Sequence, residues 1–181
     1  MDFKADSGAN FSLVESHVCP SDQQGFRSKL KDGEIFETDW INATEQDCQN
    51  WALEKSFQVN FIVQNIIIIA DARSSRDDTL LVQYYNEKLD PPLEFPKFGV
   101  LPQKQNTWYD FRVDYKLADT VDTDLNFGPI DFIYSAYFGC KEALTDERGV
   151  FNVADVERLV HEKDPVGKLE HLAGVADLEL L

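Results

Sequence analysis

The spacing of apolar residues predicts antiparallel strands in the middle of the chain. Apolar residues recur at every second position over 57–64, and the uninterrupted apolar run Ile66–Ala70 follows. A period of two is typical of a strand, and a run of β-branched residues predicts a strand that is covered on both faces. The polar stretch 71–78 then predicts a hairpin loop, and Thr79–Tyr85 predicts the returning strand.

A second alternation extends over 108–117. Its odd positions hold aromatic and aliphatic residues and its even positions hold mainly charged ones, which predicts a strand with one buried and one solvated face. Residues 34–42 predict another strand. Segment 130–140 fits a strand or a helix, and its aromatic content and short length favour the strand. The polar segment 118–126 predicts a solvated turn.

Helix signals are concentrated near the end of the chain, with one earlier exception. Thr44 predicts the N-cap of a short helix over 45–55, whose first turn carries two acids that suit the helix dipole. Asn152 predicts the cap of a helix that extends to about residue 163, where Pro165 stops it. A last short helix is expected over 168–173.

The strands in the middle and the helices near the end predict an α+β fold. We expect an antiparallel β-sandwich or part-closed barrel of about six strands, with C-terminal helices packed on one face. The length of 181 residues fits a single domain over 1–181, with 150–181 as a helical C-terminal segment. Polar residues 1–10 predict a flexible end. Segment 87–105 holds four prolines and predicts a long loop.

The charge balance excludes several classes of partner. The chain has 17 basic residues against 33 acidic ones, for a formal net charge of -16. Direct nucleic-acid binding requires clustered Lys and Arg, and the densest basic stretch, 27–31, holds only three. The longest apolar run, Ile66–Ala70, is far shorter than the roughly 20 residues that cross a bilayer, so no membrane insertion is expected. The acidity leaves open a solubility role and attraction to a basic protein.

The three cysteines, Cys19, Cys48 and Cys140, bear on the cellular compartment. Their odd number and wide spacing argue against a disulfide framework and against a Cys-x-x-Cys metal site. Free thiols in a reducing, cytoplasmic compartment are the expectation, and no signal peptide is visible. A secreted protein with one disulfide is the alternative, which the glycosylation sequons at Asn10 and Asn42 would suit.

No motif in the sequence defines a chemistry. Glycine-rich phosphate loops and nucleophile elbows are absent, and no cofactor is expected. A nucleophilic pair of Cys140 with His17 stays open, because such pairs meet only in space. One segment begins like a calcium-binding EF-hand loop, but Phe127 replaces the required glycine and Ile133 the required glutamate. A different calcium-binding turn remains as a candidate, with oxygen ligands from Asp119, Asp122, Asp124 and Asn126.

The leading functional hypothesis is a non-catalytic module that binds a basic protein surface. Its support is the acidic composition, the proline-rich segment and the absence of a catalytic motif. The expected contact residues are the carboxylates of the second alternation and of the segment after it: Asp110, Asp114, Asp119, Asp122, Asp124 and Asp131.

Two further classes remain. Aromatic strands that close into a barrel would carry a small apolar ligand, although rings that simply fill a core give the same pattern. The cavity would be lined by Phe57, Phe61, Tyr109, Phe111, Tyr115 and Tyr134. An enzyme of an unrecognised class is the third possibility, because catalytic residues that are distant in sequence leave no local signal.

Overall fold

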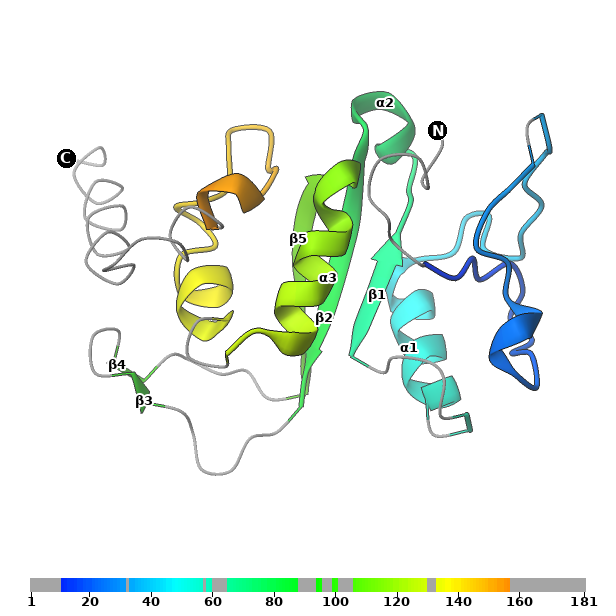
Figure 1. Cartoon of the computed structure of the whole chain (residues 1–181), viewed down its shortest axis with the longest axis horizontal. Helices are drawn as coiled ribbons and strands as arrows, with labels where there is room; N and C mark the ends of the chain where they lie inside the picture. Colours follow the sequence, from blue (N-terminus) through cyan, green and yellow to red (C-terminus); the bar gives the residue numbers. More distant parts are fainter. Residues whose placement is uncertain are drawn as a thin grey trace.

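A three-stranded antiparallel sheet forms the centre of the molecule (Figure 1). The strands β1 (Ile66–Ile69), β2 (Thr79–Asn86) and β5 (Thr107–Asp114) lie in the order β1-β2-β5. The structure is a computed structural model of the chain. It describes residues 11–31, 33–56, 58–59, 65–87, 94–95, 99–100, 106–129 and 133–156.

The hairpin predicted from the isoleucine run is confirmed. Ile66 pairs with Tyr84 and Ile69 with Leu81, so β2 returns alongside β1. The connection holds the short helix α2 (Ser74–Asp77) and ends at Asp78, whose φ of 56° reverses the chain. The second predicted strand is confirmed as β5, which pairs with the whole of β2. It ends at Asp114, before the short 3-10 helix η2 (Tyr115–Leu117).

The two faces of the sheet carry different side chains. Leu80 and Val82 of β2 share one face with Phe111 and Val113 of β5, and all four are buried. This apolar face packs against helix α3 (Ala118–Phe127) and against the π-helical segment η3 (Ile133–Gly139). The opposite face is polar at its centre, because Gln83 lies there between Ile67 and Asp110.

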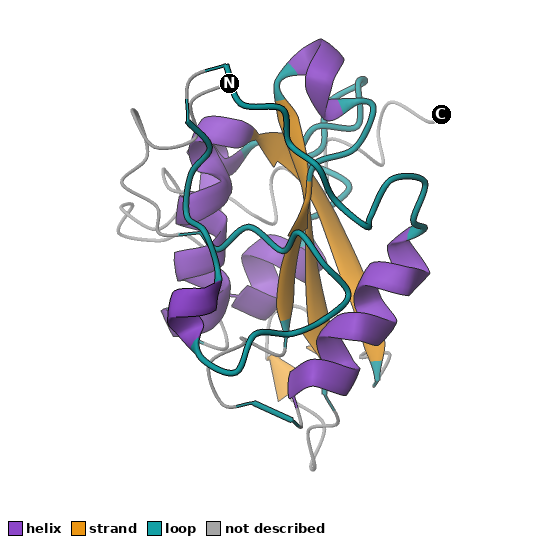
Figure 2. Ribbon diagram, turned by 90° about the vertical axis from the view of Figure 1, so that its right-hand side faces the viewer, coloured by secondary structure: helices purple, strands orange, loops and turns teal. Residues whose placement is uncertain are grey.

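Helix α1 (Glu45–Ser56) covers this polar face. Gln83 donates from Nε2 to Glu45 Oε2 at 2.7 Å and accepts from Gln49 Nε2 at 3.0 Å. The predicted N-cap of this helix is confirmed, since Thr44 Oγ1 accepts from Asp47 N at 3.2 Å. Figure 2 shows the sheet edge-on between helices. The isoleucine run predicts a strand covered on both faces, but in β1 only Ile66 is buried and residues 67–69 are partly exposed, whereas β2 is the more fully buried strand.

Two predicted strands and one predicted turn are wrong. Segment 34–42 forms no strand, and Ile35 and Ile41 in it are exposed. Segment 118–126 is helical rather than a turn, because Ala118, Val121 and Leu125 bury one side of α3. Segment 130–140 is also helical where it is described, from Ile133 to Gly139.

The six-stranded sandwich or part-closed barrel is therefore not confirmed, whereas a mixed fold with an antiparallel sheet and helices is. Two-residue strands β3 (Glu94–Phe95) and β4 (Gly99–Val100) pair within the proline-rich segment. The strand predicted over 57–64 lies almost entirely outside the described residues. The helix predicted after Asn152 begins at residue 153 and is described to residue 156. The ends 1–10 and 157–181 lie outside the described residues.

Candidate functional site: the acidic end of the sheet

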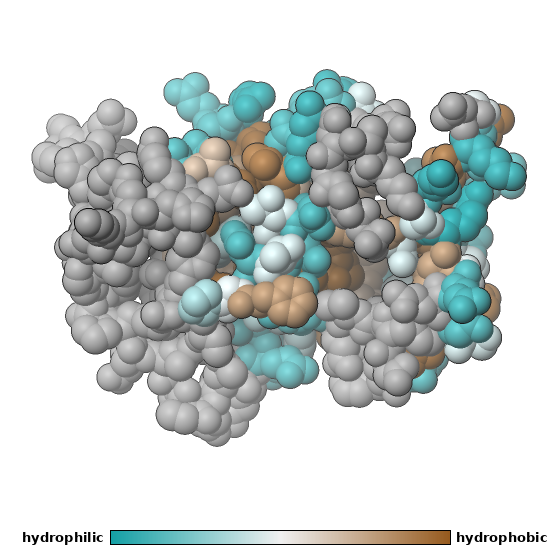
Figure 3. All heavy atoms as spheres, viewed as in Figure 1, coloured by the Kyte–Doolittle hydropathy of each residue, from teal (hydrophilic) through white to brown (hydrophobic). Residues whose placement is uncertain are grey.

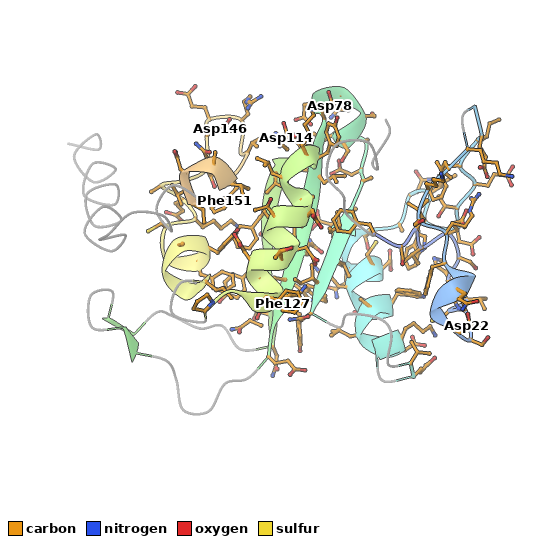
Figure 4. All side chains as sticks on the ribbon, viewed as in Figure 1. Asp22, Asp78, Asp114, Phe127, Asp146 and Phe151 are labelled. Carbon is orange, nitrogen blue, oxygen red and sulfur yellow. The ribbon has the colours of Figure 1, made fainter. Side chains whose placement is uncertain are left out.

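Four carboxylates gather where β5 passes into α3, and we call them the acidic sheet end: Asp78, Asp114, Asp119 and Asp122. The backbone brings Asp78 beside Asp114, since Tyr115 N donates to Asp78 O at 3.0 Å just after the pairing of Thr79 with Asp114. Figure 4 shows Asp78 and Asp114 at this same end of the sheet. Asp119 lies in the first turn of α3, one turn before Asp122.

Three arginines near the acidic sheet end are bound to other carboxylates. Arg112 forms an ion pair with Asp71, and Arg73 donates from Nε to Asp77 Oδ2 at 2.7 Å. Arg148 pairs with Asp146 at 2.9 Å in the adjoining turn. Within the described part of the chain, Asp78, Asp114 and Asp119 form no ion pair.

The ionised form of the Asp122 carboxyl is destabilised by its surroundings. Burial raises the pKa of its carboxyl above the ordinary range, and the neighbouring Asp119 raises it further. Asn126 opposes this effect by donating from Nδ2 to Asp122 Oδ1 at 3.1 Å. The pair Asp119 and Asp122 is therefore a like-charge contact on a helix that carries no basic residue.

The other expected contact residues are not part of this group. Asp110 points to the polar face of the sheet and pairs with Lys141 at 3.1 Å. Asp124 turns toward η3, where it accepts from Tyr137 Oη at 2.6 Å. Asp131 lies outside the described residues. Three of the six expected residues therefore belong to the acidic sheet end: Asp114, Asp119 and Asp122.

The residues of the candidate calcium-binding turn are also arranged differently from the prediction. Its residues lie on a helix, with Asp119, Asp122 and Asn126 along one side and Asp124 on another. Tyr137 occupies one oxygen of Asp124. Among the residues that the structure describes, no group of three or more His, Cys, Asp or Glu side chains is placed to hold a metal ion.

The aromatic residues proposed to line a cavity form a packed cluster where they are described. The Phe111 ring is fully buried, with centroids of Phe151 and Tyr137 at 5.2 and 5.5 Å. Tyr109 lies 4.5 Å from Phe138, and Tyr115 is partly buried against the same core. Phe57, Phe61 and the side chain of Tyr134 lie outside the described residues.

A second polar cluster, which we call the Asp71 clasp, fixes the connection between β1 and β2. Asp71 Oδ1 accepts from Ser74 N at 2.9 Å and from Arg112 Nη1 at 3.0 Å. These hydrogen bonds, led by that of Arg112, hold the pKa of Asp71 well below its ordinary range. Arg73 extends the clasp by donating to Arg148 O at 2.6 Å. Each of these side chains is paired, so the clasp orders backbone rather than presenting an open group.

The cysteines and histidines do not form a reactive pair in the described structure. All three cysteines are free, and only Cys140 is buried. Burial raises the pKa of the Cys140 thiol, which disfavours the nucleophilic thiolate. His17 is exposed and packs against Trp40 at 4.3 Å, in a segment far from η3 in Figure 1.

Sequence reasoning missed Asp78 because it was assigned to a loop. Asp tolerates the αL conformation that ends α2, and an Asp directly before a predicted strand is the sequence signal that could have placed it. The exposure of Ile35 and Ile41 was also not predicted, because their segment, which mixes apolar and acidic residues, was expected to form a strand.

Comparisons with protein families, with curated proteins and with solved structures find no match for this chain. In the described residues, no helix combines the length and the apolar character needed to cross a membrane.

Proposed function

We propose that this chain is a non-catalytic protein-binding module that engages a basic partner through the acidic sheet end. One observation carries the proposal: Asp78, Asp114 and Asp119 form no ion pair in the described structure, although three arginines lie in adjoining elements. Charges left unpaired at a surface attract and orient a complementary partner.

The electrostatics of Asp122 supports the same conclusion. Its ionised form is disfavoured by burial and by Asp119. A Lys or Arg from a partner would relieve both effects, because an opposite charge nearby favours the ionised carboxylate. The net charge of -16 adds a long-range attraction that raises the rate of encounter with a basic protein.

The test is affinity capture from a lysate of the native cell, followed by mass spectrometry. Wild-type protein is compared with D114N/D119N/D122N and with a matched control, D22N/E87Q/E142Q, which also removes three charges. Asp22 lies at the lower right of Figure 4, away from Asp78 and Asp114 at the top. We expect basic proteins to be captured by the wild type and the control but not by the first variant.

Salt provides the second arm of the test. Screening is strong near 0.5 M salt, so the captured proteins should be released steeply as salt rises toward ~0.5 M. Capture that is insensitive to salt, or equal loss in both triple variants, would contradict binding through the acidic sheet end.

A further inference from the structure

The N-terminal segment exposes large apolar side chains beside carboxylates. We define the acidic-apolar strip as residues 34–41 together with Val18. Ile35 is 82% exposed, Ile41 is 70% exposed and Val18 is 77% exposed. Figure 3 shows brown and teal atoms side by side over the N-terminal part of the chain, on the right of the view. Exposed apolar side chains of this size are typical of an interaction surface where they gather on one face of a protein.

The strip is held in place by residues that lie between its apolar side chains. Asp39 N donates to Glu15 O at 2.9 Å, and Thr38 Oγ1 donates to the same carbonyl at 3.0 Å. Arg27 bridges Glu15 and Glu34. Residues 15–17 and 38–40 are therefore neighbours, and Val18 follows them directly in the chain.

Aromatic rings anchor the strip to α1. Trp40 packs edge-on against His17 at 4.3 Å and against Trp51 at 5.7 Å. Trp51 Nε1 donates to His17 O at 2.9 Å, which fastens the N-terminal segment to the helix. Trp40 thus turns inward while the next residue, Ile41, stays exposed. The apolar side chains of the strip are presented by a fixed backbone, which lowers the entropy cost of binding them.

Acids outnumber basic residues around the strip, although Arg27 and Lys31 lie beside Glu34. Between Lys31 and Lys55 the chain holds no Lys or Arg and seven acids: Asp32, Glu34, Glu37, Asp39, Glu45, Asp47 and Glu54. The 108–131 region, by comparison, includes Arg112 and Lys116 among its acids. Within the strip, the hydroxyl of Ser16 and the backbone N of His17 donate to Asp39 and lower the pKa of its carboxyl. A complementary surface must therefore be basic as well as apolar.

We infer that the acidic-apolar strip is a second docking surface, which takes an amphipathic basic segment of another protein. Apolar side chains of that segment would cover Ile35, Phe36 and Ile41, and its Lys or Arg residues would face Glu37 and Asp39. The inference shares with the proposed function only the positive charge of the partner, and it uses a different surface, so the two can fail separately.

The experiment uses a defined probe, a fluorescein-labelled synthetic helix of 18 residues built from Leu and Lys at amphipathic spacing. A second peptide replaces every Leu by Ser at the same charge. Fluorescence anisotropy measures the Kd of each peptide for the wild type, for I35S/I41S, and for the matched control F127S, which changes a side chain that is 83% exposed outside the strip. Circular dichroism confirms that each variant is folded.

The supporting result is a Leu/Lys peptide that binds the wild type and F127S equally, and I35S/I41S at least about tenfold more weakly, because two buried apolar contacts are lost. E37Q should weaken binding by a smaller factor, and E142Q should not. Equal binding of the Lys/Ser peptide, or no effect of I35S/I41S, would overturn the inference. A loss confined to D114N/D119N/D122N would overturn it and leave the proposed function standing.

Self-association is the competing use of the strip. Sedimentation velocity over a range of concentrations decides it. A monomeric wild type supports docking of another protein. A wild-type dimer that dissociates in I35S/I41S would assign the strip to a second copy of this chain and overturn the inference.

Discussion

On one face of the sheet Phe111 is enclosed by aromatic rings, whereas on the opposite face its neighbour Arg112 is held by the carboxylate of Asp71. Both side chains come from the same strand, one residue apart. The stability of the apolar face depends on the close packing of its side chains and on the hydrophobic effect, neither of which requires a particular orientation of polar groups. The polar face depends on a small number of oriented hydrogen bonds, which fail individually when one partner is removed. This difference predicts how each face responds to mutation.

The largest effect is expected on the apolar face. Phe111→Ala leaves a cavity under Tyr137 and Phe151, so the free energy of unfolding should fall by about 3–5 kcal/mol. Urea denaturation followed by circular dichroism measures the change. Phe111→Leu, which keeps most of the volume, serves as the control and should lose much less. A loss below about 1 kcal/mol for Phe111→Ala would show that this face is not the principal core.

The Asp71 clasp gives the next effect. Asp71→Ala leaves Arg112, which is 11% exposed, without its carboxylate and removes the acceptor for Ser74 N. Breaking a fully buried pair costs 3–5 kcal/mol, and the 35% exposure of Asp71 reduces the expected loss to about 2 kcal/mol. Asp110→Ala, which breaks the exposed pair with Lys141, should change stability by less than about 1 kcal/mol. Equal losses in the two variants would contradict a special role for the clasp.

The clasp also predicts a pH dependence. The folded-state pKa of Asp71 is depressed, so its stabilising contribution is present above the unfolded pKa near ~3.9 and is lost as the pH falls below that value. Denaturation at pH 7 and pH 3 measures it. The stability difference between wild type and Asp71→Asn should shrink on acidification, and an unchanged difference would exclude Asp71 as its source.

A substitution at Gln83 tests whether every hydrogen bond of the polar face contributes to stability. Gln83→Leu keeps the volume of a side chain that is 2% exposed and removes its bonds to Glu45 and Gln49. Glu45 is exposed and regains water as a partner. The expected change in stability is therefore within about 1 kcal/mol. A loss above about 2 kcal/mol in urea denaturation would show that the network, and not the clasp alone, holds α1 on the sheet.

The smallest effect concerns the helix that covers the apolar face. Asp122→Asn removes the repulsion from Asp119, so we expect a gain of about 0.5 kcal/mol at pH 7. Because the folded pKa of Asp122 is raised, its ionisation destabilises the fold as the pH rises above ~3.9. The gain should disappear below about pH 4, where Asp122 is protonated in both states. Thermal unfolding at both pH values checks the sign.

The sequence predicts the sheet well because its pattern and its burial agree. The isoleucine run and the alternation over 108–117 gave β1, β2 and most of β5. The two helical segments on the apolar face were missed for different reasons. Helix α3 is rich in Asp, Asn and Thr, which are poor helix formers. This low helix propensity favoured a turn, and the helical spacing of Ala118, Val121 and Leu125 was overlooked.

The π-helical segment η3 was predicted as a strand because of its aromatic content. Its buried residues are Ile133, Ala136, Tyr137 and Cys140, spaced at i, i+3, i+4 and i+7, which is helical spacing. The even positions of 130–138 are also all apolar or aromatic, so both periods fit the sequence and the packing decides between them. The acidic sheet end was only half predictable, because the pairing of Thr79 with Asp114, which brings Asp78 beside β5, is a long-range contact.

One consequence of the isoleucine strand concerns aggregation. Residues 56–70 carry no charge, and they end in four isoleucines that form β1. Neutral segments of high β-propensity self-associate into cross-β stacks when they are released from a fold. Asp71 is the first charge after this stretch, and it stands where gatekeeper residues interrupt such stacking. The carboxylate that secures the native connection therefore also protects the unfolded chain from fibrils.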